Sequence, residues 1–418
     1  MRLTSGWSRR GFLGTVAAMV ASTAAPRRLF SKISASSRNT RVTGFGQSGN
    51  PYEELAVTTV INCQGTMTML GGSVLRPELE AVMAMAGRHF VSIPELEVAA
   101  GKRIAEMLKL PEGYTALVTS GAAAAMQSGL AGILTKDNEA LIRQLPDLTG
   151  MKSEVIIQKT HRNPFDHQLR STGVKLIEIE TRDDLRRAVN DRTAMMHFTN
   201  FANAAGQIKV DEWVQLAKEY NIPCMNDAAA DTPPVSHLWD YANMGYDLVT
   251  FSGGKAIRGP QCAGLLIGRK GLVSYALLNN SPHEDTIGRS QKVGKEEIIG
   301  MLKALELYQQ EDHDALAREW QAQLEEISRQ LTKIPGVSTE YFTPEIANHV
   351  PHMRITWDSR VSLEPKQVSK LLHESQPAIV IGGGEGRPGL SMCSFMLQPG
   401  EDKIVAERLS RILREHSA

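Results

Sequence analysis

The chain has 418 residues and a mass of 45.8 kDa, enough for roughly two or three domains and a substantial hydrophobic core. It carries 46 Lys and Arg residues against 46 Asp and Glu residues, and this zero net charge argues against a protein that binds nucleic acid by neutralising phosphates. Hydrophobic residues make up 42% of the chain, which excludes a largely disordered protein. The four cysteines, Cys63, Cys224, Cys262 and Cys393, form no CxxC pair, so we predict buried thiols, no disulfide scaffold and no metal site.

The first thirty residues have the layout of an export signal. Arg9 and Arg10 precede a mildly apolar run over residues 11–21, which is shorter than the roughly 20 residues that span a bilayer. The pattern around the two arginines resembles the twin-arginine signal; an amphipathic or disordered tail is the alternative. We therefore predict a signal peptide at 1–30, a linker at 31–50, and a periplasmic protein without stable membrane insertion.

Short apolar segments alternate with helical patterns over the next 200 or so residues. Strands are predicted at Leu117–Thr119, Glu154–Gln158, Val174–Ile179, Ala194–Thr199, Ile222–Asn226, Leu248–Phe251 and Ala263–Ile267. Helical patterns follow several of them, such as Ala122–Leu134, Asp184–Val189 and Asp211–Tyr220. This alternation indicates an α/β fold with a mostly parallel sheet and helices on both faces. Ligands of such sheets bind at the carboxyl ends of the strands, so we expect the chemistry there.

From Lys295 the pattern changes to long helix. Trp320, Leu324, Ile327, Leu331 and Ile334 are spaced by 4, 3, 4 and 3 residues, which places them on one helical face. Further on, strands are predicted at Met353–Trp357, Ala378–Ile381 and Leu390–Leu397, and a helix at Glu401–Glu415. We therefore predict a large domain over 51–294, and a long linking helix with a small carboxyl-terminal domain over 295–418.

A single lysine follows the strand that ends at Phe251. The sequence Phe251-Ser252-Gly253-Gly254-Lys255 runs from the strand through small residues to that lysine. A lysine held in a tight turn can be partly desolvated, which lowers the pKa of its amine and suits it to form a Schiff base. Ser252 could donate a hydrogen bond to a phosphate. By itself the motif also fits an exposed turn lysine.

An aspartate, Asp227, follows the strand predicted at Ile222–Asn226, and three alanines come after it. A carboxylate buried at such a strand end needs a cationic or hydrogen-bonding partner. The protonated nitrogen of a pyridine ring is one such partner. The alternative is that Asp227 caps the helix that follows.

Two further segments follow predicted strands. Ser120-Gly121-Ala122 joins a strand to an alanine-rich helix, where backbone N–H groups can bind an anion; close packing of the helix on the sheet is the alternative. His161 comes three residues after Gln158, the end of another strand. It could stack on an aromatic cofactor, or it could be a merely exposed loop residue.

Together these segments resemble the pyridoxal-phosphate enzymes of the aspartate-aminotransferase fold, also called fold type I. Within that superfamily the chain is most similar to the selenocysteine synthase (L-seryl-tRNA(Sec) selenium transferase)-like group, and there to its D-glucosaminate-6-phosphate ammonia-lyase branch. The resemblance covers about residues 55–415. The matching stretches are Val60–Thr66 with Leu70–Ser73, Thr119–Ala123, His161–Asn163, Asp227–Ala229, and Ser252–Lys255 with Gly259–Gln261. It implies a mostly parallel sheet of the seven-stranded type, a smaller carboxyl-terminal α/β domain, and pyridoxal 5′-phosphate as the cofactor.

The resemblance also implies roles for single residues. Lys255 would attach the cofactor covalently and move the α-proton of the substrate. Asp227 would keep the pyridine nitrogen protonated, so that the ring accepts electrons. The implied phosphate cradle consists of Ser120, Gly121, Ala122 and Ser252. His161 would stack on the ring, and an arginine of the small domain, Arg354 or Arg387, would hold the substrate carboxylate.

Several functions fit this resemblance. The preferred one is a carbon–nitrogen lyase (ammonia-lyase) that removes the α-proton of an amino acid or amino sugar acid and eliminates a β-substituent, giving a keto acid and ammonia. Selenium transfer to seryl-tRNA starts in the same way, but family members that perform it carry a helical tRNA-binding domain, which we do not expect before Val60. Aminotransferase, racemase, aldolase and non-catalytic binding functions stay open. The family's cofactor pocket lies at a subunit interface, so we expect a homodimer or larger oligomer with a small-molecule substrate and no nucleic-acid partner.

Overall fold

The computed structural model describes residues 49–383 and 389–417. The predicted signal at 1–30 and most of the predicted linker at 31–50 lie outside these residues. The chain separates into two compact units, one ending at Thr58 and one beginning at Thr59. The described part of the first unit holds helix α2 (Pro51–Glu54), which Asn50 caps by accepting a hydrogen bond from the Tyr52 N–H at 3.1 Å. In the described ranges, no helix has both the length and the apolar character needed to cross a bilayer.

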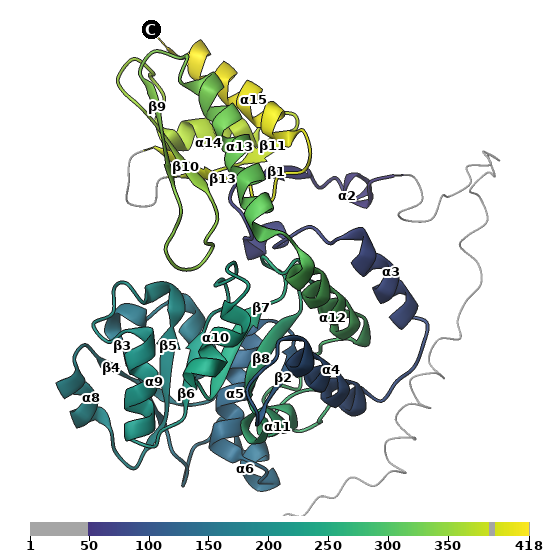
Figure 1. Ribbon diagram of the computed structural model, residues 1–418, viewed down its shortest axis with the longest axis vertical. Helices are drawn as coiled ribbons and strands as arrows, with labels where there is room; N and C mark the ends of the chain where they lie inside the picture. The colour runs from purple at the N-terminus through teal and green to yellow at the C-terminus, as the bar shows by residue number, and fades with distance from the viewer. Residues whose placement is uncertain (1–48, 384–388, 418) are drawn as a thin grey trace, which may run out of the picture. The chain divides into compact units, whose positions relative to one another are not determined.

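A seven-stranded sheet is the largest sheet of the described part of the second unit (Figure 1). In spatial order its strands are β2 (Tyr114–Thr119), β8 (Gly264–Arg269), β7 (Leu248–Ser252), β6 (Cys224–Asp227), β5 (Thr193–Thr199), β3 (Glu154–Gln158) and β4 (Lys175–Ile179). Only β8 runs antiparallel to its neighbours; the other adjacent pairs are parallel. The predicted α/β fold with a mostly parallel sheet is therefore confirmed.

Both faces of this sheet are covered, because successive side chains of a strand point to opposite sides. Leu117 of β2 and Val155 of β3 pack in a core with α5 and α11, whereas their neighbours Val118 and Ile156 pack in a core with α4, α9, α10 and α12. This double burial explains why the strands are nearly continuous apolar runs. The helices around the sheet are α3 (Pro77–Ala86), α4 (Ile93–Met107), α5 (Ala122–Thr135), α6 (Glu139–Gln144), α7 (His167–Arg170), α8 (Arg182–Ala188), α9 (Val210–Glu219), α10 (His237–Met244), α11 (Lys270–Leu278) and α12 (Lys295–Gln310).

The reversed strand β8 joins two distant segments at the carboxyl edge of the sheet. Its first residue, Gly264, pairs with Thr119 at the end of β2 and with Ser252 at the end of β7. Because β8 runs against its neighbours, its start lies beside their ends. The turn after Thr119 and the turn after Ser252 therefore begin close to each other.

A smaller domain is built around a second hydrophobic core, to which Leu324, Ile327 and Leu331 contribute. Those three residues were predicted to share one helical face, and they are buried on α13 (His313–Leu331). A four-stranded antiparallel sheet has the order β12 (Gly382–Gly383), β13 (Leu390–Cys393), β10 (His352–Trp357) and β9 (Val337–Phe342). Helices α14 (Pro365–His373) and α15 (Glu401–Glu415) complete this domain.

The domain boundary was predicted between residues 294 and 295, but two segments pack in the other domain than this boundary implies. Strand β1 (Val60–Asn62) pairs in parallel with β11 (Ala378–Val380), and Ile61 is buried in the core of the smaller domain. Helix α12 instead packs on α3 and α4 in a core of the large domain. The predicted long linking helix is thus two helices, because Asp312 starts α13 anew by accepting a hydrogen bond from the Ala315 N–H at 2.8 Å.

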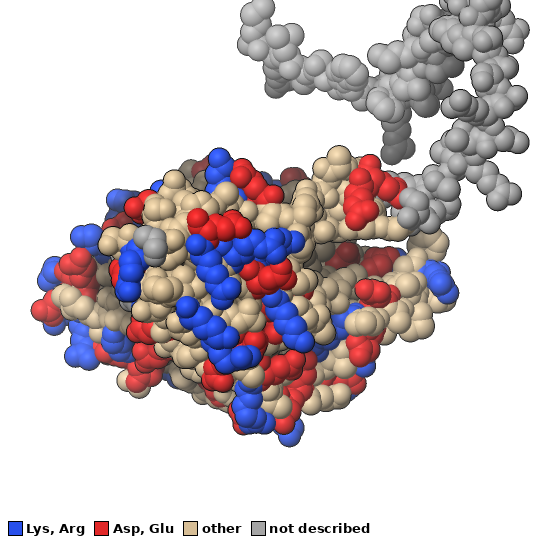
Figure 2. Space-filling view, turned by 90° about the horizontal axis from the view of Figure 1, so that it is seen from above, with Lys and Arg blue, Asp and Glu red and all other residues tan. Residues whose placement is uncertain are grey.

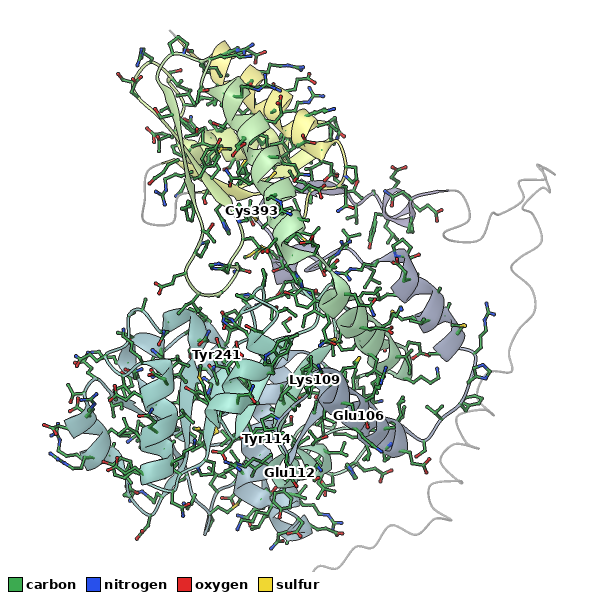
Figure 3. The ribbon with its side chains drawn as sticks, viewed as in Figure 1. Glu106, Lys109, Glu112, Tyr114, Tyr241 and Cys393 are labelled. Atoms are coloured by element: carbon green, nitrogen blue, oxygen red, sulfur yellow. The ribbon has the colours of Figure 1, made fainter. Side chains whose placement is uncertain are left out.

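Three of the four cysteines are buried as predicted, and Cys262 is exposed. Cys393, labelled in Figure 3, ends β13 of the smaller domain, and its N–H donates to the carbonyl oxygen of Cys63 at 3.0 Å. Burial raises the pKa of both thiols, so they stay protonated and pack as small apolar groups. Figure 2 shows Lys and Arg side chains interspersed with Asp and Glu on the face in view, without a large field of one sign.

Candidate active site

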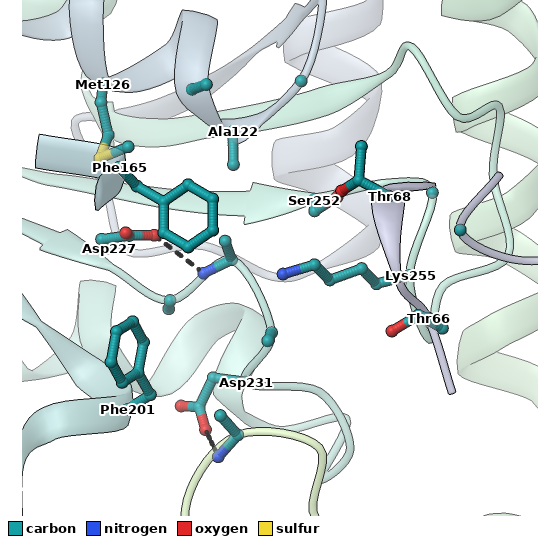
Figure 4. A pocket seen from close by; sticks show the side chains of 18 of the residues that line it. Thr66, Thr68, Ala122, Met126, Phe165, Phe201, Asp227, Asp231, Ser252 and Lys255 are labelled. Atoms are coloured by element: carbon teal, nitrogen blue, oxygen red, sulfur yellow. Dashed lines mark hydrogen bonds between the residues drawn. The ribbon is translucent and has the colours of Figure 1, made fainter. Parts of the chain in front are cut away.

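A cavity of about 260 Å³ opens at the carboxyl edge of the large sheet (Figure 4). Six of the nine residues predicted for the site line it: Ser120, Gly121, Ala122, Asp227, Ser252 and Lys255. They come from the segments after β2, β6 and β7, which the sheet order places near one another. The order of the strands therefore brings together residues that are far apart in the sequence; Ser120 and Lys255 are separated by 135 positions.

Lys255 points into this cavity from the loop after β7 (Figure 4). The loop is held by its own backbone: Gly253 N–H donates to Ala263 O, and Gly259 N–H donates to Gly253 O, both at 2.8 Å. A Cβ on Gly253 would come within 2.8 Å of the Ala263 carbonyl oxygen, a backbone atom, so this close packing requires glycine. Burial lowers the pKa of the Lys255 amine, while attraction to Asp227 opposes that shift. A lowered pKa increases the fraction of free amine, the form that attacks a carbonyl.

Asp227 ends strand β6 and is almost fully buried. Its Oδ1 accepts hydrogen bonds from the Ala229 N–H at 3.2 Å, drawn in Figure 4, and from Thr250 Oγ1 at 3.4 Å. Burial raises the pKa of this carboxyl, and the hydrogen bonds and Lys255 act against the rise. No helix follows directly, since α10 begins only at His237, so Asp227 is not a helix cap. Among the described residues no cation is in direct contact with Asp227, and a protonated ring nitrogen in the cavity would supply that contact.

The turn Ser120-Gly121-Ala122 leads into the first residues of α5, a helix of 14 residues. Gly121 has φ 111°, a conformation that favours glycine, and Thr119 Oγ1 donates to Gly121 O at 2.9 Å. The turn lies against β8: a Cβ on Gly264 would come within 2.4 Å of the Gly121 carbonyl carbon. Backbone N–H groups at the helix start, with the hydroxyls of Ser120 and Ser252, form a cradle suited to a phosphate.

His161 lies elsewhere than predicted. It is fully buried beside Phe198, with ring centroids 4.5 Å apart, and its Nδ1 accepts a hydrogen bond from the Thr199 N–H at 3.2 Å. It does not line the cavity, because it packs against Phe198 and Thr199 of β5. Two exposed aromatic rings, Phe165 and Phe201, line the cavity instead. Each follows the end of a parallel strand, and this was the signal in the sequence that could have identified them.

The two predicted carboxylate-binding arginines are not part of the described lining. Arg354 lies on β10, where its Nη1 pairs with Glu340 Oε2 at 2.7 Å and its guanidinium lies over the Phe342 ring, 5.0 Å from the centroid. These contacts tie Arg354 to the antiparallel sheet of the smaller domain. Arg387 belongs to residues 384–388, outside the described residues. Among the described residues that line the cavity, Lys255 is the one cation.

A second buried carboxylate, Asp231, lines the cavity and was missed by the sequence analysis. Its Oδ2 accepts hydrogen bonds from Asn200 and from the Tyr241 hydroxyl, and lies 3.0 Å from His237 Nδ1. Its Oδ1 accepts from the Ala347 N–H at 3.1 Å, in the loop between β9 and β10 (Figure 4). Asp231 therefore positions a loop of the smaller domain at the cavity.

The family description "Aminotransferase class-V" matches residues 92–387, more than half of the chain. The chain belongs to the aminotransferase class-V family. Pyridoxal 5′-phosphate is its cofactor, and the residues present fit that group: an amine, a buried carboxylate and an anion cradle meet in one cavity. The match to the family therefore confirms the predicted enzyme class and cofactor.

Individual relatives agree with the predicted group. The class-V chain is 28% identical over 386 residues to D-glucosaminate-6-phosphate ammonia lyase of Salmonella typhimurium, covering 88% of this chain and 99% of that one. It is 27% identical to the 5′-C-glycyluridine monooxygenase-decarboxylase of a Streptomyces species, covering 87% and 92%. It is 28% identical over 280 residues to an L-seryl-tRNA(Sec) selenium transferase of Mannheimia succiniciproducens, covering 62% and 58%. A solved structure of D-glucosaminate-6-phosphate ammonia-lyase superposes with a TM-score of 0.76 at 26% identity, covering 88% and 99%.

Proposed function

We propose that this chain is a pyridoxal 5′-phosphate-dependent ammonia-lyase that converts an amino acid or amino sugar acid into a keto acid and ammonia. The observation that carries the proposal is the pairing of Lys255 and Asp227 in one cavity, where burial lowers the pKa of the amine and raises that of the carboxyl. The likeness to D-glucosaminate-6-phosphate ammonia lyase over 99% of that protein supports the reaction class.

The cofactor, when bound, accepts the electron pair that the substrate α-carbon releases. Asp227 then holds a proton at the ring nitrogen, and the Ser120–Ala122 turn with Ser252 holds the phosphate. Lys255 Nζ takes the proton from the α-carbon, whose C–H bond breaks, and returns it to the departing β-hydroxyl, which leaves as water. Hydrolysis then consumes one water and releases the keto acid and ammonia, so no external oxidant or reductant is needed.

The predicted export signal supports a narrower substrate class. Phosphorylated sugar acids are largely cytoplasmic metabolites, which an exported enzyme would not meet. The described lining of the cavity has apolar walls, among them Met126, Phe165 and Phe201. We therefore propose an amino or hydroxyamino acid without a phosphate, although the relative's name includes one.

The test is to incubate the purified, cofactor-loaded enzyme with amino acids, hydroxyamino acids and sugar amino acids, with and without a phosphate. Ammonia and keto acid should form in equal amounts from a β-substituted substrate, and the Lys255→Ala variant should form neither. Amino-group transfer to an added keto acid, without free ammonia, would instead identify an aminotransferase. Turnover of the phosphorylated compounds alone would refute the narrower substrate class.

We also propose that the enzyme works as a homodimer or larger homo-oligomer. The apolar faces of α12 and α13 do not support this, since they pack inside the chain. Support comes from α3, α4 and the segment between them, where Met85, Phe90 and Val98 are exposed. A second copy of the chain would cover these side chains. Light scattering should show an oligomer that the Phe90→Asp variant weakens; an active wild-type monomer would overturn the proposal.

A further inference from the structure

A second cavity, of about 190 Å³, shares the lysine loop with the first one. Lys255 lines the first cavity, whereas Ala256 and Arg258 of the same loop line the second. The other walls come from the start of α3 at Arg76, from the end of α12 through the first turns of α13, and from residues 395–399 after β13. A volume several times the about 30 Å³ that one water occupies in the liquid is enough for a small ligand.

Arg76 is the buried polar group of this second cavity, with 7% of its surface exposed. Its Nη2 lies 2.8 Å from Glu311 Oε1, but neither Nε nor Nη2 has a well-aligned hydrogen-bond acceptor among the described residues. Tyr308 lines the same cavity, and its buried hydroxyl has no well-aligned hydrogen-bond partner in the described part of the chain, although Thr232 lies close enough to lower its pKa. Nη2 of Arg76 faces the Glu311 carboxylate, whereas a buried donor without an aligned acceptor costs free energy. An acceptor in the cavity would therefore stabilise Arg76 Nε and the Tyr308 hydroxyl.

Two guanidinium groups, those of Arg76 and Arg258, line this cavity. Arg258 donates from Nε to Val74 O at 3.1 Å, a neutral partner. Burial lowers the pKa of Arg258, and the positive charge of Arg76 lowers it further, which shows that the two guanidinium groups lie within electrostatic reach of each other. Glu311 is the carboxylate paired with Arg76. Glu311 and Glu78 act against the lowering of the Arg258 pKa, and the remaining carboxylate of the lining, Glu319, is exposed to solvent.

We propose that this cavity binds a small oxyanion, a carboxylate or phosphate group of a metabolite, between Arg76 and Arg258. Guanidinium groups suit such a ligand because their N–H groups match the spacing of its oxygens. The backbone N–H of Arg258 donates to the carbonyl oxygen of Lys255 at 2.9 Å, so an anion held by the Arg258 side chain also holds the loop that carries Lys255. The proposed anion site thus lies outside the cavity of the proposed reaction. The four consecutive residues 255–258 link the two cavities.

The test measures equilibrium binding to the cofactor-loaded protein by titration calorimetry, with inorganic phosphate in one arm and acetate in the other. Loading matters because the cofactor then fills its own phosphate cradle. Wild type should bind at least one of the two anions saturably, and Arg258→Gln should bind it at least tenfold more weakly. Arg318→Gln is the matched control, since Arg318 is exposed on α13, does not line the cavity and carries the same charge. Binding of phosphate alone would assign the site to a phosphorylated ligand. Binding of acetate would assign it to a ligand with a carboxylate group.

A second variant tests the buried arginine without leaving an unpaired charge. Arg76→Gln alone would strand Glu311, so Arg76→Gln is combined with Glu311→Gln, and retention of the cofactor's absorbance reports that the double variant is folded. It should also lose anion binding. The proposal is overturned if wild type binds neither anion, or if Arg258→Gln binds as tightly as wild type. Because this assay scores binding and not turnover, its failure would leave the proposed lyase reaction standing, and failure of the lyase reaction would leave the anion site standing.

Discussion

Asp227 and Lys255 reach one cavity from the ends of neighbouring strands, and each favours the charged form of the other. Burial acts against both charges, because it raises the pKa of the carboxyl and lowers that of the amine. A ligand between them meets a nucleophilic amine on one side and a carboxylate on the other. A pyridine ring with an aldehyde and a basic nitrogen matches that pair.

Lys255 should carry the cofactor covalently. Borohydride reduction of the loaded enzyme, followed by peptide mapping, should place the label on the peptide that contains Lys255, since this is the lysine that lines the cavity. The Lys255→Ala variant should stay folded and take up no label. A label on an exposed lysine such as Lys102 in the wild type would show that another residue binds the cofactor.

Asp227→Asn should keep the fold and lose about a hundredfold or more in kcat, because one preorganised charge at the ring nitrogen is removed. The amide retains an oxygen that can accept from the Ala229 N–H, so the turn after β6 should persist. Asp147→Asn, an exposed position on the large domain, serves as the control and should keep full activity. Wild-type turnover in Asp227→Asn would remove Asp227 from the proposed mechanism.

Gly264→Ala should weaken cofactor binding by tenfold or more. The affinity is measured by titrating the cofactor into the apoenzyme. The added methyl would meet the Gly121 carbonyl carbon at 2.4 Å and the Ala122 nitrogen at 2.6 Å, so the turn that forms the phosphate cradle must move. Gly271→Ala in α11 meets nothing within 4 Å and should bind normally. Equal affinities of the two variants would show that the cradle lies elsewhere.

His161 should make folding stability depend on pH. Burial lowers its pKa to about 4, whereas an unfolded histidine titrates near 6.5, so between these values the unfolded chain binds a proton that the folded chain does not. The free energy of unfolding should therefore be highest above about pH 6.5 and fall as the pH drops toward 4, with His161 accounting for roughly 3 kcal/mol. His197, whose pKa burial lowers to about 3, acts in the same direction.

Urea unfolding at pH 7 and pH 5 measures this effect. His161→Gln should show a smaller drop between the two pH values than wild type, even if it is less stable at both. His373→Gln, at an exposed histidine of α14, should keep the wild-type drop. An unchanged drop in His161→Gln would mean that this ring is accessible to protons in the folded state.

Export should depend on Arg9 and Arg10. A twin-arginine route carries folded proteins, which suits an enzyme whose cofactor site is assembled from segments as distant as Ser120 and Lys255. Replacing both arginines with lysine should keep the protein in the cytoplasm, and the wild type should reach the periplasm with a signal cleaved near Ala24 or Ala25. Normal export of the double variant, seen by cell fractionation, would refute the twin-arginine prediction.

Much of this fold and site follows from local sequence patterns. Apolar runs and glycine turns are enough to predict the strands of the large sheet, because burial on both faces makes each strand continuously apolar. Ser120, Asp227, Ser252 and Lys255 could be named because each comes at the end of a strand, and parallel strands end at one edge. These predictions needed only neighbours along the chain.

Tertiary structure decided what depends on distant segments. His161 and Phe165 follow the same strand, yet only Phe165 lines the cavity, because His161 is covered by residues around Thr199. Arg354 meets Glu340 across two antiparallel strands, a pairing set by register. Ile61 packs in the smaller domain because β1 pairs with β11, more than 300 residues later. Local periodicity determines which residues form helices and strands, whereas close packing between distant segments determines which side chains meet.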